Sequence, residues 1–187
     1  MTTWLTGDQH FGHFNAIAYC NRPWSTVDEM DNSLINAWNT VVKPDDLIYH
    51  LGDFTLGNRF EAERLFRELN GCIRVLDYPW HHDKRWLHRQ SYISASLNAV
   101  YYENSIVIIE EVDSNVEGHG IPAILCHYAF EIWDRRHYGS LHFHGHSHGM
   151  LPHIPNRLDA GVDNAYKLTG EYRPLELQEA CEFAKAV

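Results

Sequence analysis

The chain lacks the features that would place it in a membrane or outside the cell. Its 187 residues contain no apolar run long enough to cross a bilayer. The N-terminal sequence MTTWLTGDQH lacks the basic start and apolar stretch of a secretory signal. The four cysteines are scattered and form no C-x-x-C pair, which favours reduced thiols over a disulfide framework or a thiolate zinc site. We therefore expect a soluble cytoplasmic protein with no membrane partner.

Basic residues are also scarce. The chain has 15 Lys and Arg against 25 Asp and Glu, a formal net charge of −10. A surface that follows the phosphates of duplex nucleic acid needs clustered Lys and Arg, so a duplex partner is not expected.

No internal repeat, low-complexity tract or linker divides the chain. With 44% hydrophobic residues, it is long enough to form one domain, residues 1–187, with a sizeable core. Short apolar or alternating runs predict strands at 3–6, 47–51, 72–76, 105–109, 121–126 and 141–144. Helical spacing predicts helices from about 26 to 41, at 59–69 and at the C-terminus, about 175–186. Strands that alternate with helices indicate a layered α/β domain.

The first of these helices has the clearest boundaries in the sequence. Thr26 and Glu29 have the spacing of a capping box, and the apolar residues that follow recur at helical spacing. Pro44 bars the helix from continuing.

Oxygen and imidazole side chains follow several predicted strands. Asp8 and His10 come after the first strand, and Asp53 comes after the second. His127 closes the strand at 121–126, and the sequence Gly-His-Ser-His places His146 and His148 after the last strand. Two ligands spaced by two residues can point to the same side. The pattern suggests two metal ions held side by side at the edge of a sheet.

The order and spacing of these motifs resemble the calcineurin-like metallophosphoesterase superfamily, and above all its small single-domain bacterial and phage members. The resemblance rests on the segments DQHFGHFNAIAYCNRPW, IYHLGDFTLGN and LHFHGHSHG and spans residues 4–172. It implies an α/β fold of two stacked, mixed β-sheets flanked by helices, a four-layer αββα sandwich. It also implies that the site lies at the strand ends.

The resemblance implies a ligand set for two divalent ions, of Mn, Fe, Ni or Zn. Asp8, His10 and His148 match ligands of the first ion, and His127 and His146 match ligands of the second. Asp53 matches the aspartate that bridges the two. Ions about 3.5–4 Å apart need an anionic bridging ligand, which a carboxylate supplies and a neutral imidazole does not.

The chain departs from the family pattern at residues 79–83. Where the family has Gly-Asn-His-Asp, this sequence has Pro-Trp-His-His-Asp. His82 then matches the catalytic histidine and Asp83 the acid that orients it. His81 replaces the asparagine that ligates the second ion, and Trp80 replaces a glycine. Two interpretations remain open: a working site with an imidazole donor, or a weakened second metal site.

The resemblance implies hydrolysis of a phosphate ester, with a diester favoured over a monoester, by a hydroxide that bridges the two ions. His82 would protonate the leaving oxygen or bind the phosphoryl group. His13, Trp80 and Arg85 are candidates for contact with a small phosphorylated substrate such as a nucleotide. Two alternatives are a catalytically weakened phosphoesterase fold that serves as a binding module and a metallohydrolase acting on a non-phosphate bond.

Overall fold

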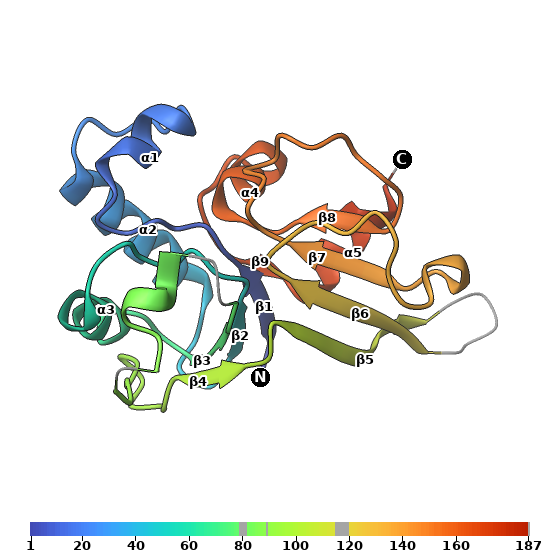
Figure 1. Cartoon of the computed structure of the whole chain (residues 1–187), viewed down its shortest axis with the longest axis horizontal. Helices are drawn as coiled ribbons and strands as arrows, with labels where there is room; N and C mark the ends of the chain where they lie inside the picture. The colour runs from blue at the N-terminus through green and yellow to red at the C-terminus, as the bar shows by residue number, and fades with distance from the viewer. Residues whose placement is uncertain (79–81, 89, 115–119, 187) are drawn as a thin grey trace.

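The structure, a computed structural model, describes residues 1–78, 82–88, 90–114 and 120–186. It is an α/β fold with two mixed β-sheets flanked by helices, as predicted (Figure 1). The first sheet and helices α1 to α3 occupy one half of the molecule. The second sheet lies beside them with α4 and α5.

The first sheet has five strands in the order β4-β3-β2-β1-β9. Strands β1 (Thr3–Thr6), β2 (Leu47–His50), β3 (Cys72–Leu76) and β4 (Tyr101–Glu103) are parallel to their neighbours. The short strand β9 (Leu175–Glu176) pairs antiparallel with β1. Since Thr6 pairs with His50, β1 and β2 end level with each other, and the loops that follow them leave the sheet together.

The second sheet has four strands in the order β5-β6-β7-β8. Strand β5 (Ile106–Ser114) is antiparallel to β6 (Gly120–Cys126), whereas β7 (Leu141–His144) and β8 (Arg157–Asp159) continue parallel to β6. The carboxyl ends of β6, β7 and β8 therefore lie at one edge, where ligand-binding loops of parallel sheets gather.

Helices α2 (Val27–Val41) and α3 (Arg59–Phe66) pack on the first sheet. Their buried apolar residues, which include Leu34, Trp38 and Phe66, form one core with Ile48 and Ile73. The predicted capping box is present at the start of α2: Thr26 Oγ1 accepts from Glu29 N, and the Glu29 carboxylate accepts from Thr26 N. The remaining helical segments are α1 (Phe14–Tyr19), α4 (Val162–Thr169), α5 (Leu177–Lys185) and the 3₁₀ turns η1 (His82–Arg85) and η2 (Arg136–Tyr138).

A second core joins the two sheets. Leu5 and Leu76 of the first sheet belong to the same buried cluster as Leu125 and Phe143 of the second sheet and Ala180 of α5. The C-terminal helix begins at Leu177 instead of residue 175, because Leu175 and Glu176 pair with β1. Across the described residues, no helix has both the length and the apolar character needed to span a bilayer.

Candidate metal centre

The predicted ligands lie together where the strands of both sheets end. Asp8, His10 and His148 form one group, and Asp53, His127 and His146 form a second; in each, one donor atom per residue lies within 4.8 Å of the others. Asp53 Oδ2 lies 3.6 Å from His10 Nε2 and 3.6 Å from His127 Nε2. A single carboxylate oxygen therefore lies between the two groups, in the place predicted for a bridging ligand.

Five of these residues share an unusual backbone conformation. The φ angles of Asp8, His10, Asp53, His146 and His148 are 61°, 52°, 56°, 64° and 49°. Residues other than glycine adopt this left-handed region at a cost of about 1–3 kcal/mol, and such strain gathers at functional sites. Backbone hydrogen bonds fix it here: Asp8 N donates to Gly52 O at 3.0 Å, and His10 N donates to Asp53 O at 3.1 Å.

Two glycines make room for the ligands. A Cβ atom at Gly52, where φ is +113°, would lie 2.8 Å from His127 Nδ1. A Cβ atom at Gly161 would lie 2.3 Å from Asp8 Oδ2. Because real Cβ atoms do not approach other atoms this closely, a side chain at either position would displace a predicted ligand.

Hydrogen bonds orient two of the imidazoles. His127 Nδ1 donates to Leu51 O at 3.0 Å, and His148 Nδ1 donates to the Asp163 carboxylate at 2.6 Å. For His127, this leaves Nε2 directed at Asp53 Oδ2, 3.6 Å away. An imidazole held through its other nitrogen is the arrangement found for histidines that bind metals. His10 is only 5% exposed, and neither ring nitrogen has a hydrogen-bond partner within the described chain. A buried imidazole without such partners fits a metal ligand.

The buried carboxylates place negative charge in a poorly solvated position. Burial raises the pKa of Asp8 well above its usual value, and the nearby carboxylates of Asp159 and Asp53 raise it further. Burial also acts to raise the pKa of Asp53, but His127 and His10 lower it overall. Burial lowers the pKa of His10 to about 3, so its imidazole is neutral and able to donate a lone pair. Divalent cations would balance this charge.

Arg22 and Asp163 support the site and are not among the residues predicted from the sequence. Arg22 is 5% exposed and binds both carboxylate oxygens of Asp163, each at 2.9 Å. It also donates to the carbonyl oxygens of Asp8 and Gln9, each at 2.7 Å. Since Asp163 holds His148, one arginine links the loop after β1 to a ligand after β7. The only sequence signal was that Arg22 belongs to the first segment carrying the family resemblance.

His82 lies beside the candidate ligands on the open side of the site. Its backbone N donates to Asp53 Oδ1 at 3.0 Å, and its Nε2 lies 3.9 Å from Asp53 Oδ2. Its side chain is 45% exposed, and its ring centroid lies 5.4 Å from that of His10. His10, Asp53 and His82 also form a group that could hold a metal ion. His82 can therefore reach a bound substrate, or alternatively act as a ligand.

Asp83 is buried and has a role in holding the loop. Its carboxylate accepts hydrogen bonds from the backbone N of Phe54 and Thr55 and from Trp86 Nε1. These bonds fasten η1 to the loop that carries Asp53. The predicted orientation of the His82 ring by Asp83 stays a prediction. His81, the proposed ligand of the second ion, and Trp80, a proposed substrate contact, lie outside the described residues.

A cavity of about 410 Å³ opens over the ligands. His10, Asp53, His82, His146 and His148 contribute to its lining. His13 lines it as well, and its contact with a substrate stays a prediction. Cys20 also lines it, and its Sγ lies 3.3 Å from His148 Nδ1, so this thiol belongs to the surroundings of the site. Arg85 does not contribute to this lining; its Nη1 donates to Leu56 O at 3.3 Å on the surface.

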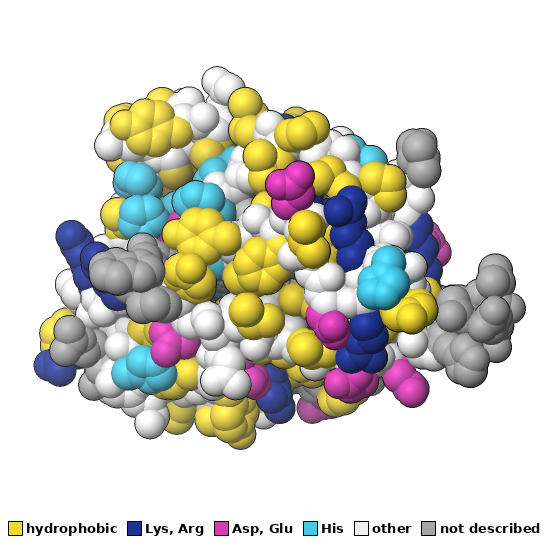
Figure 2. Space-filling model, turned by 45° about the vertical axis from the view of Figure 1, so that its right-hand side comes forward, with side chains coloured by type: hydrophobic (Ala, Val, Ile, Leu, Met, Phe, Trp, Pro, Cys, Tyr) yellow, Lys and Arg dark blue, Asp and Glu magenta, His cyan; other side chains and the backbone are white. Residues whose placement is uncertain are grey.

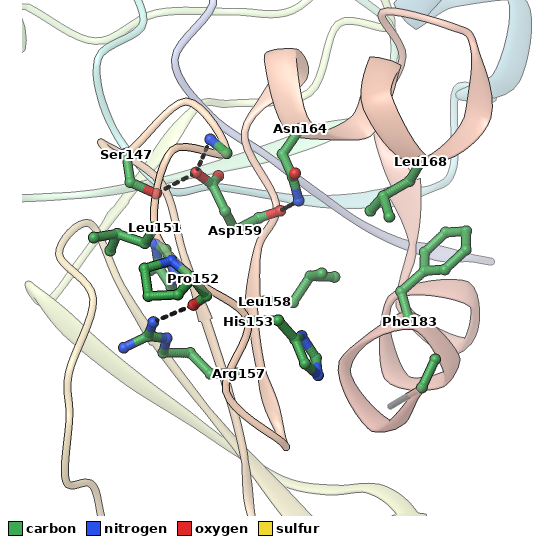
Figure 3. Close-up of a pocket in the computed structure, with 13 residues that line it drawn as sticks. Ser147, Leu151, Pro152, His153, Arg157, Leu158, Asp159, Asn164, Leu168 and Phe183 are labelled. Carbon is green, nitrogen blue, oxygen red and sulfur yellow. Dashed lines mark hydrogen bonds between the residues drawn. The ribbon is translucent and has the colours of Figure 1, made fainter.

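Asp159, at the end of β8, holds the loop that carries His146 and His148. It accepts hydrogen bonds from Ser147 Oγ at 2.6 Å and from Gly149 N at 2.8 Å, and its carbonyl accepts from Asn164 Nδ2 (Figure 3). A second cavity of about 330 Å³ lies behind this loop, and Ser147 lines both cavities. The metal-site loop is thus supported from the side away from the ligands.

Comparisons with known proteins find similar chains, but the names of these proteins state no function. No protein-family model matches the chain. An uncharacterized protein of Methanocaldococcus jannaschii is 45% identical over 83 residues, which is 43% of this chain and 46% of that protein. The gene 66 protein of Mycobacterium phage L5 is 39% identical over 56 residues, 30% of this chain and 27% of that protein. The matches thus span less than half the length of these curated relatives.

A solved structure supports the fold along nearly the whole chain. The crystal structure of a protein of unknown function from Aquifex aeolicus superposes with a TM-score of 0.63, covering 97% of this chain and 98% of that one. At 21% sequence identity, this likeness concerns the fold alone.

Proposed function

We propose that the protein is a phosphoesterase dependent on two divalent metal ions, of the calcineurin-like type that its motifs resemble. The observation that carries the proposal is the position of Asp53 Oδ2, 3.6 Å from an imidazole nitrogen of each candidate ligand group. The strained backbone, the oriented imidazoles and the buried carboxylates support the same interpretation. The ions would be drawn from Mn, Fe, Ni and Zn, all of which accept imidazole and carboxylate ligands.

The chain's residues would divide the work. Asp8, His10 and His148 would hold the first ion and His127 and His146 the second, and Asp53 would contribute to both sites. When bound, two such ions supply Lewis acidity for the phosphoryl oxygens and activate water as the nucleophile. His82, on the open side, donates a proton to the leaving oxygen as a general acid. His13 contributes a further polar group to the same cavity.

A phosphodiester suits the cavity better than a monoester. Among the described residues that line it, none is Lys or Arg. A dianionic monoester would lack side-chain cations to balance its second charge, whereas a diester carries one negative charge. The proposed substrate is therefore a small phosphodiester, with nucleotide derivatives among the candidates. The cytoplasmic location expected from the sequence stays part of this proposal.

The test combines metal analysis with two matched substrates. Purified protein is reconstituted separately with Mn, Ni, Zn and Fe(II), and the metal content is measured. Turnover of bis(p-nitrophenyl) phosphate is then compared with that of p-nitrophenyl phosphate, which releases the same leaving group. We expect two ions per chain and faster turnover of the diester.

Each other result has a definite meaning. Faster turnover of the monoester would reverse the substrate assignment. Two bound ions without turnover of either ester would support a binding module or hydrolysis of a non-phosphate bond instead. Fewer than two ions at saturation would contradict the paired site.

A further inference from the structure

One side of the metal-site cavity is apolar. Ala16 and Tyr19 of α1 and Met150, which follows the loop after β7, line the same cavity as the candidate metal ligands. Tyr19 is 77% exposed and Met150 is 80% exposed. Neither residue belongs to the two hydrophobic cores, so neither is needed to fill the interior. Large apolar side chains exposed at the mouth of a polar cavity mark a surface that contacts a ligand.

The apolar surface continues beyond the ligands. An adjoining cavity of about 310 Å³ shares Tyr19 and Met150 with the first and adds Tyr166 and Tyr172. The rings of Tyr166 and Tyr172 are stacked, with centroids 4.3 Å apart. On the molecular surface, histidine side chains lie next to hydrophobic ones (Figure 2). A group larger than a methyl thus has tyrosine rings to follow as it leaves the metal site, beside the polar side chains of Asp163 and Lys167 that also line this cavity.

The two sides of the cavity differ in chemistry. The imidazoles and carboxylates on one side suit metal ions and the phosphoryl group. The tyrosine ring and the thioether on the other side suit a flat, polarizable group, since aromatic rings stack on tyrosine and contact methionine sulfur favourably.

We propose that Tyr19 and Met150 form a subsite for a planar aromatic substituent of the phosphodiester. This inference rests on the proposed function, because it places the phosphoryl group at the metal ligands. The substrate class is a phosphodiester that carries an aromatic ring, as an aryl group or a nucleobase. Tyr19 stacks on the ring, Met150 contacts it through its sulfur, and the organic group extends toward Tyr166.

The experiment measures binding instead of turnover. The affinities of the metal-loaded protein for the singly charged monomethyl esters of phenylphosphonate, cyclohexylphosphonate and methylphosphonate are compared by isothermal titration calorimetry. These probes share the phosphonate and differ only in the organic group. We expect phenylphosphonate to bind roughly tenfold more tightly than methylphosphonate, in keeping with stacking on one aromatic side chain. Cyclohexylphosphonate should lie nearer to methylphosphonate.

Variants locate the subsite. Tyr19→Ala should remove most of the preference for the phenyl group, and Tyr19→Phe should keep it. Met150→Ala should weaken it. Tyr138→Ala is the matched control, because Tyr138 is 72% exposed and does not line this cavity. All variants should retain the metal content of the parent protein.

A second pair of ligands distinguishes the two sources of the ring. The methyl phosphodiesters of adenosine 5′-monophosphate and of ribose 5-phosphate each carry one negative charge and differ in the nucleobase. Tighter binding of the nucleotide, lost in Tyr19→Ala, assigns the subsite to nucleobases; a preference confined to the phenyl group assigns it to aryl esters.

Equal affinities for the three phosphonates would overturn the subsite and leave the phosphoesterase proposal standing. Equal binding of phenyl and cyclohexyl groups, both tighter than methyl, would overturn its aromatic character. Failure of all the probes to bind the metal-loaded protein would contradict the phosphate site itself, and the subsite with it.

Discussion

At the scale of single residues, Asp8 shows how closely metal binding and loop structure are joined at this site. Its two carboxylate oxygens accept the backbone N–H of His146, at 3.0 and 2.9 Å, and its carbonyl accepts from Arg22. Its backbone is left-handed, with φ of 61°. The same residue therefore orients the loop that carries His146 and contributes a donor atom to the first ligand group.

His82 gives the sharpest test of the catalytic assignment. His82→Ala should keep both ions and lose roughly 10²- to 10⁴-fold in turnover, the usual contribution of a positioned general acid. Metal content and the rate of diester hydrolysis are measured on the same preparations. The companion variant His81→Asn introduces the family's donor and should keep much of the activity. Loss of an ion from His82→Ala would instead identify His82 as a ligand, together with His10 and Asp53.

A substitution at Asp163 tests whether the hydrogen bond that orients His148 contributes to metal binding. Asp163→Asn removes the charge that pairs with Arg22 and holds His148; burial favours the neutral acid, but these two partners lower the pKa of Asp163 to about 2. We expect the affinity of the first ion to fall about 10- to 100-fold, the usual effect of removing the group that orients a metal-binding histidine. Competition with a chelator measures it. Asp134→Asn, a change at an exposed acid, is the control, and equal affinities in the two variants would contradict this role.

At the scale of elements, the sequence predicted those with strong local signals. Helix α2 was identified because its capping box and helical spacing are local, and the six predicted strands are apolar runs. Strands β4, β8 and β9 have three, three and two residues, too short for a periodic pattern. Helices α1 and α4 have six and eight residues, and neither has a side-chain cap. Their formation depends on tertiary contacts.

The same distinction applies to the site. The six ligands could be predicted from the sequence because each follows a strand that could itself be predicted. Arg22 and Asp163 were not, because their link joins residues 141 positions apart. The sequence predicts only a reduced thiol at Cys20, since nothing local indicates that its sulfur lies 3.3 Å from a nitrogen of His148. Contacts between loops of different strands are fixed by the packing of the sheets, which the sequence pattern does not show.

Helix α2 also provides a prediction about pH. Asp31 is buried on this helix. Its carboxylate accepts a hydrogen bond from Gly12 N at 3.1 Å, in the segment after β1 that also carries Asp8 and His10. Burial raises its pKa to about 6, although the hydrogen bond from Gly12 opposes this. The folded state therefore binds the proton more tightly than the unfolded state, whose aspartates titrate near 3.9. The contribution of Asp31 to stability falls as pH rises from about 4 to about 6.

Asp31→Asn should remove this dependence while keeping an acceptor for Gly12. The stability of the metal-free variant relative to the parent protein should rise across this interval, by on the order of 1 kcal/mol after allowance for partial solvation. Urea unfolding at several pH values measures the difference. A constant difference from pH 4 to pH 7 would show that the carboxyl of Asp31 titrates normally.

At the scale of the whole molecule, the candidate ligands come from both sheets. Asp8, His10 and Asp53 follow strands of the first sheet, whereas His127, His146 and His148 follow strands of the second. Each group in which three of these donors meet contains residues from both sheets. Bound ions would therefore tie the two sheets together in addition to the buried core that they share.

A single substitution, Asp53→Ala, should remove the connection that the ions make between the two sheets. Because Asp53 lies between the two groups, the variant should lose both ions together. In the parent protein, an ion present at 100 times its dissociation constant stabilises the folded state by about 2.7 kcal/mol per site, so manganese should raise Tm and a chelator should reverse the rise. In Asp53→Ala, Tm should not respond to manganese. Asp45→Ala, at an exposed aspartate, is the control and should respond like the parent protein. A retained manganese response in Asp53→Ala would place the ions elsewhere.

The wide spacing of the ligands along the chain also governs the kinetics of folding. The first group joins residues 8 and 10 to residue 148, so its donors meet only after the strands of both halves have paired and docked. Contacts that form after the transition state slow unfolding and leave the folding rate nearly unchanged. Bound metal ions would therefore lengthen the lifetime of the folded structure and leave the rate at which it forms nearly unchanged.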